Sequence, residues 1–347
     1  MNSIVLLFGG ASSERRVSVA SAQHVLERLP QALAWFESPE GPVFEVPASD
    51  LAALERPFET DFLSRGAPRF ATLAAALDAS RALPEPGRVH LLGYHGGAGE
   101  DGTVQRLFEE RGLAFTGSGA EASAKAFDKA WAKRLATAAG VPCAEARPLP
   151  HGDEAGCAEA LRDLVARFGR AVAKPVAGGS SVGLYHLRTP ADVPAAARAI
   201  AVAPEAYLAE EFLAGRELTV GVVEGPGQGL RALPCSEVRL DEGFAFDFAG
   251  KYLGRGTTEV TPAQIDPAIA HAAQELAVIA HRALGCEGYT RTDLIVTARG
   301  PVYLETNTLP GLTKRSFIPQ QLEAEGTSVL AFLEGQLALA RARQARR

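Results

Sequence analysis

The sequence predicts an α/β fold, and two strand-to-loop transitions support this prediction. Residues 4–8 form a continuous apolar run, Ile-Val-Leu-Leu-Phe, which ends in Gly9-Gly10 and precedes a helical pattern over about residues 17–29. Residues 89–92 form a second apolar run that also ends in glycine. Buried parallel strands have this uninterrupted apolar character, and doubly wound sheets bind ligands at the carboxyl ends of such strands. We therefore expect a doubly wound parallel-sheet domain at the N-terminus with a binding site at this edge.

Length and composition are those of a globular enzyme with two or three domains. The chain has 347 residues, of which 47% are hydrophobic and 22% charged, and its formal net charge of -6 argues against nucleic acid as a partner. The N-terminus lacks the basic region of a signal peptide, and no apolar run approaches the ~18 residues of a transmembrane helix, so we expect a cytoplasmic protein that does not enter the membrane. The four cysteines are scattered and are expected to be reduced thiols.

A predicted hairpin near the C-terminus contains three potential metal ligands. Asp293 opens an apolar run, and the run that returns after a Gly-Pro turn ends in Glu305 and Asn307. Antiparallel pairing would bring Asp293 and Glu305 together, and Asn307 follows two residues later on the same face. Three hard oxygen ligands suit Mg²⁺, although a hairpin with acidic ends would show the same pattern.

The segment after this hairpin carries a resemblance to a known family. Asp293, Glu305-x-Asn307 and Pro310-Gly-Leu-Thr-x-x-Ser316 resemble the metal and acceptor site of the ATP-grasp ligases, specifically D-alanine–D-alanine ligase. Six motifs occur in the order of that family over nearly the whole chain. The resemblance implies ATP as co-substrate and two Mg²⁺ ions, or Mn²⁺, held by the three hairpin residues.

The same resemblance implies a three-domain ATP-grasp fold and assigns roles beside the metal. The doubly wound domain would span residues 1–118, and two α+β domains, 119–206 and 207–347, would clasp ATP between them. Arg291 and the backbone N–H of Gly311 would stabilise the oxyanion of the tetrahedral intermediate. Ser316 would bind the carboxylate of the second substrate.

Two glycine-containing loops of the N-terminal domain resemble the substrate loops of the family. Gly9-Gly10-x-Ser-x-Glu14 implies that Glu14 faces the ammonium of the first D-amino acid, with a helix cap as the alternative. His95-Gly-x-x-Gly-Glu100-Asp-Gly-x-x-Gln implies that His95 lies beside the substrate carboxylate and that residues 100–102 shape the loop. A structural hydrogen-bonding histidine is the alternative, and a phosphate loop is less favoured because the Lys-Ser/Thr ending is missing.

Two further segments resemble the nucleotide phosphate site. A helix predicted from about residue 122 to 139 contains Asp128-Lys129, where the resemblance implies that the lysine reaches the phosphates and the alternative is a solvated helix face. Lys174-Pro-Val-Ala-Gly-Gly179-Ser180-Ser181-Val-Gly follows a short strand. Its exposed backbone N–H groups and hydroxyls favour an anion-binding flap over a plain hairpin turn, and the resemblance places Gly179 and Ser181 on ATP.

The remaining motifs resemble the adenine, ribose and gating elements of the family. By that resemblance Glu217 binds the ribose hydroxyls, with an exposed strand residue as the alternative, and Lys251 contacts the transferred phosphate. Tyr252 would close the first-substrate pocket together with Ser180 and Glu14. The residues expected to line the adenine pocket are Glu210, Phe212 and Leu213.

Some positions depart from the family pattern. Arg16 stands where a smaller or acidic residue is usual, Ala177-Gly178 replaces a more polar pair, and residues 40–87 fit loosely. Phe317 replaces a leucine beside the second-substrate pocket, where it could narrow that pocket or change the acceptor.

The leading hypothesis is a homodimeric D-alanine–D-alanine ligase that acts on D-alanine and ATP for peptidoglycan synthesis. One alternative is a related ligase with D-serine, D-lactate or another acceptor. The other alternative is a non-catalytic ATP-binding relative. A terminal helix over about residues 327–347 has a basic end, which we expect to complement the helix dipole.

Overall fold

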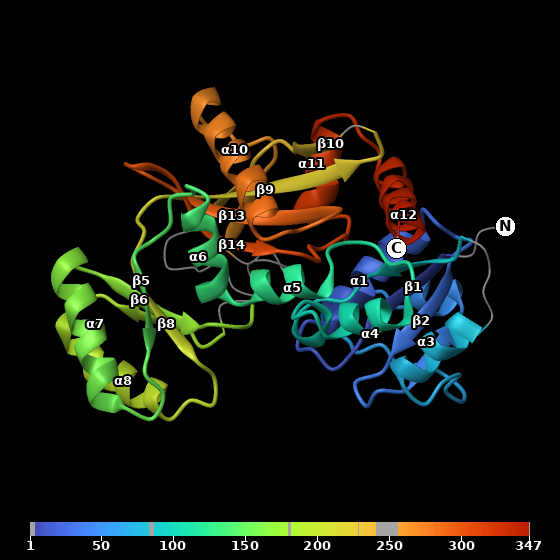
Figure 1. The fold of residues 1–347 in the computed structure, drawn as a ribbon, viewed down its shortest axis with the longest axis horizontal. Helices are drawn as coiled ribbons and strands as arrows, with labels where there is room; N and C mark the ends of the chain where they lie inside the picture. Colours follow the sequence, from blue (N-terminus) through green and yellow to red (C-terminus); the bar gives the residue numbers. More distant parts are fainter. Residues whose placement is uncertain (1–3, 83–86, 180–181, 228, 241–255, 347) are drawn as a thin grey trace.

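The computed structural model describes residues 4–82, 87–179, 182–227, 229–240 and 256–346. Three β-sheets organise the chain, and each is covered by helices (Figure 1). The N-terminal sheet has the order β3-β2-β1-β4, in which β1 lies between two parallel neighbours and β3 pairs antiparallel to β2. Its strands are β1 (Ile4–Gly9), β2 (Leu33–Glu37), β3 (Val43–Val46) and β4 (Val89–Leu92).

Helices cover both faces of this first sheet, because alternate residues of β1 point to opposite sides. Leu6 and Phe8 belong to the core beneath α1, whereas Val5 and Leu7 belong to the core beneath α3 and α4. The doubly wound arrangement is therefore confirmed. The helices of this part are α1 (Arg15–Leu26), α2 (Ala48–Ala52), α3 (Leu73–Ala82) and α4 (Thr103–Arg111), with the 3-10 helix η1 (Gly97–Gly99).

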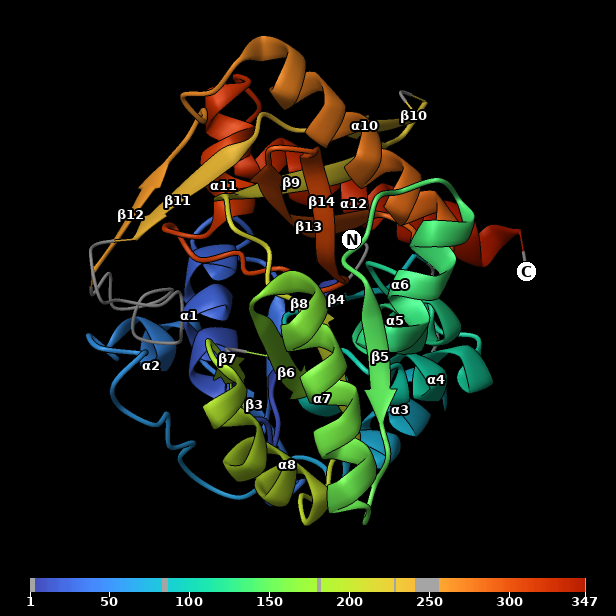
Figure 2. The ribbon, with the colours of Figure 1, turned by 90° about the vertical axis from the view of Figure 1, so that its left-hand side faces the viewer.

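The second sheet is antiparallel with the order β5-β8-β6-β7, and α7 and α8 pack together on it (Figure 2). Its elements are β5 (Ala146–Leu149), α7 (Glu154–Phe168), β6 (Ala171–Pro175), β7 (Tyr185–Leu187), η2 (Pro190–Asp192), α8 (Val193–Ala201) and β8 (Tyr207–Glu211). The strand β8 belongs to this sheet, although the predicted domain boundary lies just before it. The division at residues 118 and 206 stays a prediction, and sheet membership favours a second boundary after residue 211.

The third sheet is antiparallel and has the order β12-β11-β9-β13-β14, with β10 also paired to β9. The predicted hairpin is present as β13 and β14, and the helix expected over residues 265–284 is present as α10. The strands are β9 (Arg216–Gly225), β10 (Gly229–Ala232), β11 (Ser236–Leu240), β12 (Thr257–Val260), β13 (Tyr289–Thr297) and β14 (Gly300–Asn307). The helices are α10 (Pro267–Ala283), α11 (Phe317–Ala324) and α12 (Val329–Ala345).

The single helix expected over residues 122–139 is wrong, because the chain breaks at Asp128. This residue has an extended backbone (φ -81°, ψ 101°), and its carboxylate accepts a hydrogen bond from the Trp131 backbone N–H at 2.7 Å. The segment therefore forms α5 (Ala120–Phe127) and a separately capped α6 (Lys129–Ala138). Asp128 is a helix cap, and Lys129 becomes the first residue of α6, where its backbone N–H donates to the Val176 carbonyl at 2.9 Å.

The arginines near the C-terminus make contacts that the dipole interpretation missed. Arg343 donates to the carbonyl oxygens of Phe115 and Gly117 and pairs with Glu287. Arg341 donates to the Gly87 carbonyl at 3.0 Å. The helix α12 therefore ties the N-terminal domain to the rest of the chain. No described helix is long and apolar enough to cross a membrane.

Replacing Asp128 by Ala should lower the free energy of unfolding by about 1 kcal/mol, because the α6 N-terminus loses its side-chain cap. Asp128→Asn is the matched control, since asparagine also caps helices well and should retain most of the stability. Urea unfolding of the three proteins would measure both changes. Equal stability of the Ala variant and the unsubstituted protein would contradict the capping role.

Candidate active site

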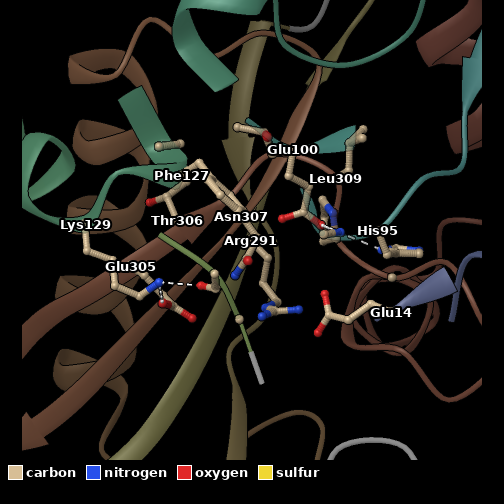
Figure 3. A pocket seen from close by; sticks show the side chains of 17 residues that line it. Glu14, His95, Glu100, Phe127, Lys129, Arg291, Glu305, Thr306, Asn307 and Leu309 are labelled. Carbon is tan, nitrogen blue, oxygen red and sulfur yellow. Dashed lines mark hydrogen bonds and ion pairs between the residues drawn. The ribbon is translucent and has the colours of Figure 1, made fainter. Parts of the chain in front are cut away.

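A cavity lies where the carboxyl edge of the N-terminal sheet faces the β13–β14 hairpin (Figure 3). Its walls come from the loop before α1, the loop after β4, the α5–α6 junction, the loop after β6, and the hairpin with its following segment. The described lining residues that the sequence singled out are Glu14, His95, Glu100, Lys129, Gly179, Arg291, Glu305, Asn307 and Gly311. The structure thus brings together residues almost 300 positions apart in the chain.

The hairpin pairs the two acidic residues as expected. Asp293 is the register partner of Glu305, and Arg291 is the partner of Asn307, with a bulge directly after Asp293. The Asp293 carboxylate accepts two hydrogen bonds from Arg291, Nε to Oδ1 at 2.9 Å and a terminal nitrogen to Oδ2 at 2.8 Å. Asn307 Nδ2 lies 3.4 Å from the same carboxylate. This bidentate ion pair between Arg291 and Asp293 fixes the plane of the Asp293 carboxylate.

Lys129 links the hairpin to the predicted phosphate loop. Its Nζ lies 3.4 Å from Glu305 Oε2 and donates to the Gly178 carbonyl at 2.6 Å. The first residue of α6 therefore supplies a cation between β14 and the loop after β6. This cation lies between the Glu305 carboxylate and the loop that is expected to bind phosphate.

Glu14 approaches the backbone of two glycine-containing loops. A Cβ on Gly96 would lie 3.0 Å from Glu14 Oε2, and one on Gly179 would lie 3.4 Å from Glu14 Oε1. Gly96 also has a φ of +67°, which favours glycine on conformational grounds. Glu14 stands at the N-cap position of α1, but its side chain makes no cap hydrogen bond, so it is directed to the cavity (Figure 3).

His95 and Glu100 are buried beside Glu14, and burial moves both toward their neutral forms. Burial, helped by the positive charge of Arg291, lowers the pKa of His95 to about 4. Burial, helped by the negative charge of Glu14, raises the pKa of Glu100 to about 7. His95 Nε2 lies 3.0 Å from the Ser21 hydroxyl. His95 is therefore neutral near pH 7, whereas Glu100 gains or loses its proton near that pH.

The segment after β14 forms the opposite wall. Ser316 stands at the N-cap of α11, and its Oγ accepts from the Thr313 backbone N–H at 3.1 Å. A Cβ on Gly311 would lie 2.6 Å from that Oγ, so a larger residue there would displace the Ser316 hydroxyl. The helix α1 holds this segment, because His24 Nδ1 donates to the Leu312 carbonyl at 2.6 Å.

Phe317, the residue that departs from the family pattern, packs against the site arginine. It is the first residue of α11, only 7% of its surface is exposed, and its ring centre lies 5.9 Å from the guanidinium carbon of Arg291. The Phe317 ring therefore lies within cation–π distance of the guanidinium that lines the cavity.

A second cavity extends from Lys129 and Glu305 between the second and third sheets. At its inner end Glu210 is paired with two lysines, with Nζ of Lys174 at 3.1 Å and Nζ of Lys133 at 3.3 Å from its oxygens. Burial would raise the pKa of Glu210, but the two lysines together lower it. The sequence indicated no role for Lys133, because only its ion pair with Glu210, between α6 and β8, reveals it.

The outer part of this second cavity contains the other residues expected to bind nucleotide. The Phe212 ring carries the Arg170 guanidinium over its face at 3.8 Å. Leu213 follows it, and Glu217 on β9 also lines this cavity. An aromatic face beside aliphatic side chains suits a planar base.

Four predicted site residues lie outside the described residues, namely Ser180, Ser181, Lys251 and Tyr252. The proposed set of Tyr252, Ser180 and Glu14 is therefore described only at Glu14. Arg16, which departs from the family pattern near the first loop, makes a bidentate ion pair with Asp61. Its Nε lies 3.0 Å from Oδ1, and a terminal nitrogen lies 3.2 Å from Oδ2.

The raised pKa of Glu100 predicts a measurable pH dependence. Between pH 4.5 and about 7 the folded protein keeps a proton on Glu100 that the unfolded chain releases, so this group's contribution to stability falls as the pH rises. Glu100→Gln removes that titration, so its stability relative to the unsubstituted protein should increase from about pH 5 to about pH 7 and then level off. Urea unfolding across this range measures the difference. A difference that does not change with pH would contradict the burial of an ionisable Glu100.

Two family models match the chain. One is described as D-ala D-ala ligase N-terminus and matches residues 3–118, and the other is described as D-ala D-ala ligase C-terminus and matches residues 135–336. The D-alanine–D-alanine ligase of Leptospira interrogans is 35% identical over 349 residues, with 95% of each chain covered. That of Acidiphilium cryptum is 37% identical over 328 residues, with 92% of each chain covered.

Solved structures of similar fold cover almost the full length. The VanG D-Ala:D-Ser ligase of Enterococcus faecalis has a TM-score of 0.78 at 25% identity and covers 98% of this chain and 100% of its own. The D-alanyl-alanine synthetase A of Vibrio cholerae has a TM-score of 0.78 at 25% identity, with 98% of each chain covered. By its sequence models, its relatives and its ATP-grasp architecture, the chain belongs to the D-alanine–D-alanine ligase family.

Proposed function

We propose that this chain uses ATP to join two D-alanines into D-alanyl-D-alanine, the dipeptide required for peptidoglycan precursors. Family membership supports the reaction. The observation that carries its assignment to this cavity is the meeting of Glu14, Arg291 and Glu305 around one space, with Asp293 as the register partner of Glu305 on the neighbouring strand. An ammonium-binding carboxylate, an oxyanion-binding cation and a phosphate-facing pair of acids are the groups that such a ligation needs.

The chemistry follows from the free energy of amide formation, which is unfavourable in water. The carboxylate of the first D-alanine attacks the γ-phosphorus of ATP, which gives an acyl phosphate and ADP. The neutral amine of the second D-alanine then attacks the acyl carbon, phosphate leaves, and the amine loses its proton. Phosphoryl transfer depends mainly on positioning and charge neutralisation, and acyl transfer depends on stabilising the tetrahedral oxyanion.

Each substrate group has a candidate partner in the cavity or, for Ser316, beside its Gly311 wall. Glu14 would bind the ammonium of the first D-alanine, and neutral His95 would hydrogen-bond its carboxylate without adding charge. Arg291 and the Gly311 backbone N–H would stabilise the oxyanion. Ser316, at the N-cap of α11, would bind the carboxylate of the second D-alanine, where the helix N-terminus favours negative charge.

The second cavity would hold ATP. Lys129 and Lys174 would neutralise the phosphates, and Gly179 would bind them through its backbone N–H. The roles of Ser181 and Lys251 stay predictions from the sequence. Glu217 would bind the ribose hydroxyls. The adenine would lie among Glu210, Phe212 and Leu213.

The hairpin residues fit a divalent cation. Asp293 and Glu305 are register partners with Asn307 beside them, and two carboxylates with one amide leave room for phosphate oxygens, as Mg²⁺ or Mn²⁺ requires. Within the chain, Arg291 and Lys129 balance these carboxylates. We propose that Asp293, Glu305 and Asn307 hold two such ions, which neutralise phosphate charge when bound.

Asp293→Asn and Glu305→Gln should each lower turnover at least about a hundredfold with the fold intact, because each removes a carboxylate from the proposed metal site. Raising the Mg²⁺ concentration should partly restore activity. Glu287→Gln is the matched control, since it removes a carboxylate that pairs with an arginine away from the cavity. Full activity of both site variants would rule out the metal assignment.

A D-serine acceptor is the second candidate function. The VanG structure, a D-Ala:D-Ser ligase, is similar to the chain over its whole length, and Phe317 packs against Arg291 beside the proposed acceptor site. A non-catalytic ATP-binding relative is less favoured, because Asp293, Glu305, Asn307, Lys174 and Arg291 are all retained.

Phe317→Leu should change the KM for the second substrate by about tenfold, because a smaller side chain alters the packing behind Arg291. The KM for ATP should change by less than about twofold, since Phe317 is not among the described residues that line the second cavity. Steady-state kinetics with each substrate varied in turn would measure both. Equal changes in the two constants would contradict this position for Phe317.

The proposed function is tested by phosphate release from ATP and Mg²⁺, with products identified by mass. D-Alanine alone should give D-alanyl-D-alanine. Product only from D-alanine mixed with D-serine, D-lactate or L-alanine would move the acceptor, and no product from any pair would contradict the ligase. We also propose a homodimer in the cytoplasm, which sedimentation of the purified protein and fractionation of cells would test.

A further inference from the structure

Gln321 is a buried polar side chain on α11 that reaches into the third sheet. It lies where β10 and β11 diverge from the same edge of β9, since β10 pairs with residues 222–225 and β11 with residues 217–219. Its Oε1 accepts from the Gly221 backbone N–H at 2.9 Å. Its Nε2 donates to the Thr219 carbonyl and to the Ser236 hydroxyl, both at 3.0 Å. The side-chain amide thus takes the place of a peptide unit in the gap.

The fit around this amide is tight and specific. Gln321 is 0% exposed, and a buried amide is tolerated only when its donors and acceptor are paired, as they are here. A Cβ on Gly221 would lie 2.6 Å from Gln321 Oε1 and 2.7 Å from Ile318 Cδ1. The helix α11 therefore presses directly on the β9 backbone, and its position is set by hydrogen bonds with fixed geometry.

The two β9 residues that hold Gln321 lie opposite the site residues on the neighbouring strand. Gly221 is the register partner of Arg291, and Thr219 is the register partner of Asp293. The Thr219 hydroxyl also donates to the Asp293 carboxylate. One strand thus has the α11 anchor on one side and the two charged groups of the site on the other.

The helix α11 depends on such an anchor. It has eight residues, which is too short to be stable alone. It begins at Phe317 directly after Ser316, the proposed ligand of the acceptor carboxylate. Its buried face also contains Ile318 and Leu322. These apolar side chains hold α11 against the sheet, but apolar packing is not directional and does not fix where along the sheet the helix lies.

We propose that Gln321 is a positioning residue for the acceptor half of the reaction. By fixing α11 to Gly221 and Thr219, it sets where Ser316 stands relative to Arg291 and Asp293. This inference rests on the proposed function of Ser316 and Arg291. Loss of the anchor lets the acceptor bind poorly while ATP and the first D-alanine still react, so the acyl phosphate is hydrolysed by water to D-alanine and phosphate.

Gln321→Met tests this inference, because methionine keeps the volume and removes the hydrogen bonds. Gln336→Met is the matched control: Gln336 is 3% exposed, lies on α12, and its Nε2 donates at 3.0 Å to the Glu224 carbonyl, near the other end of β9. The measured quantities are the KM for D-alanine at the second site, the KM for ATP, the ratio of phosphate released to dipeptide formed, and the melting temperature.

Gln321→Met should raise the second-site KM about tenfold, because two buried backbone groups lose their partner, and should raise the phosphate-to-dipeptide ratio above that of the unsubstituted protein. Its KM for ATP should stay within about twofold. Gln336→Met should lower the melting temperature and leave the ratio and both KM values unchanged. Unchanged second-site KM and ratio in Gln321→Met, or the same shifts in both variants, would overturn the inference.

Ser236→Ala is a milder second variant, since it removes one of the three hydrogen bonds. It should shift the second-site KM in the same direction by about two- to threefold, and no shift would overturn the inference even if Gln321→Met does not fold. An unsubstituted protein that forms no dipeptide would count against the proposed function. An active unsubstituted protein with unaffected variants would count against the positioning role alone.

Discussion

The site is organised by the ion pair between Arg291 and Asp293. Both residues lie on one face of β13, and the neighbouring strands hold them through Thr219 on β9 and Asn307 on β14. Burying two charges is tolerated only when they are paired and hydrogen-bonded. The same holds for Lys129 with Glu305. The carboxylates and cations that neutralise one another within the chain are thus the groups that would face metal and phosphate in the reaction.

Three sheets supply parts that none of them holds alone. The N-terminal sheet contributes Glu14 and His95, the loop after β6 contributes Gly179, and the third sheet contributes Arg291. Contacts far from the chemistry keep these parts in register, such as His24 of α1 on the Leu312 carbonyl. The arrangement agrees with a reaction in which the γ-phosphate of ATP and the amine of the acceptor must both reach the carboxyl group of the first substrate.

Features with a local signal could be predicted from the sequence, and features that depend on tertiary contact could not. The apolar runs predicted the buried strands, and the hairpin spacing predicted that Asp293 meets Glu305. The break at Asp128 was missed because the helical spacing of apolar residues continues across it. An aspartate at this position is compatible both with an exposed helix face and with a helix cap. Gln321 follows Pro319 and Gln320, and nothing in this local sequence distinguishes it from an exposed glutamine. Only its burial in the structure reveals its role as an anchor.

The central claim is that an acyl phosphate is formed and consumed where the two cavities meet, beside Lys129 and Glu305. The most direct test is to supply D-alanine with a heavy oxygen isotope in its carboxylate and to analyse the released phosphate by mass. Attack of the carboxylate on ATP predicts one labelled oxygen in each phosphate that accompanies a dipeptide. Unlabelled phosphate with dipeptide still formed would contradict the account, because the carboxylate would then have been activated by another route.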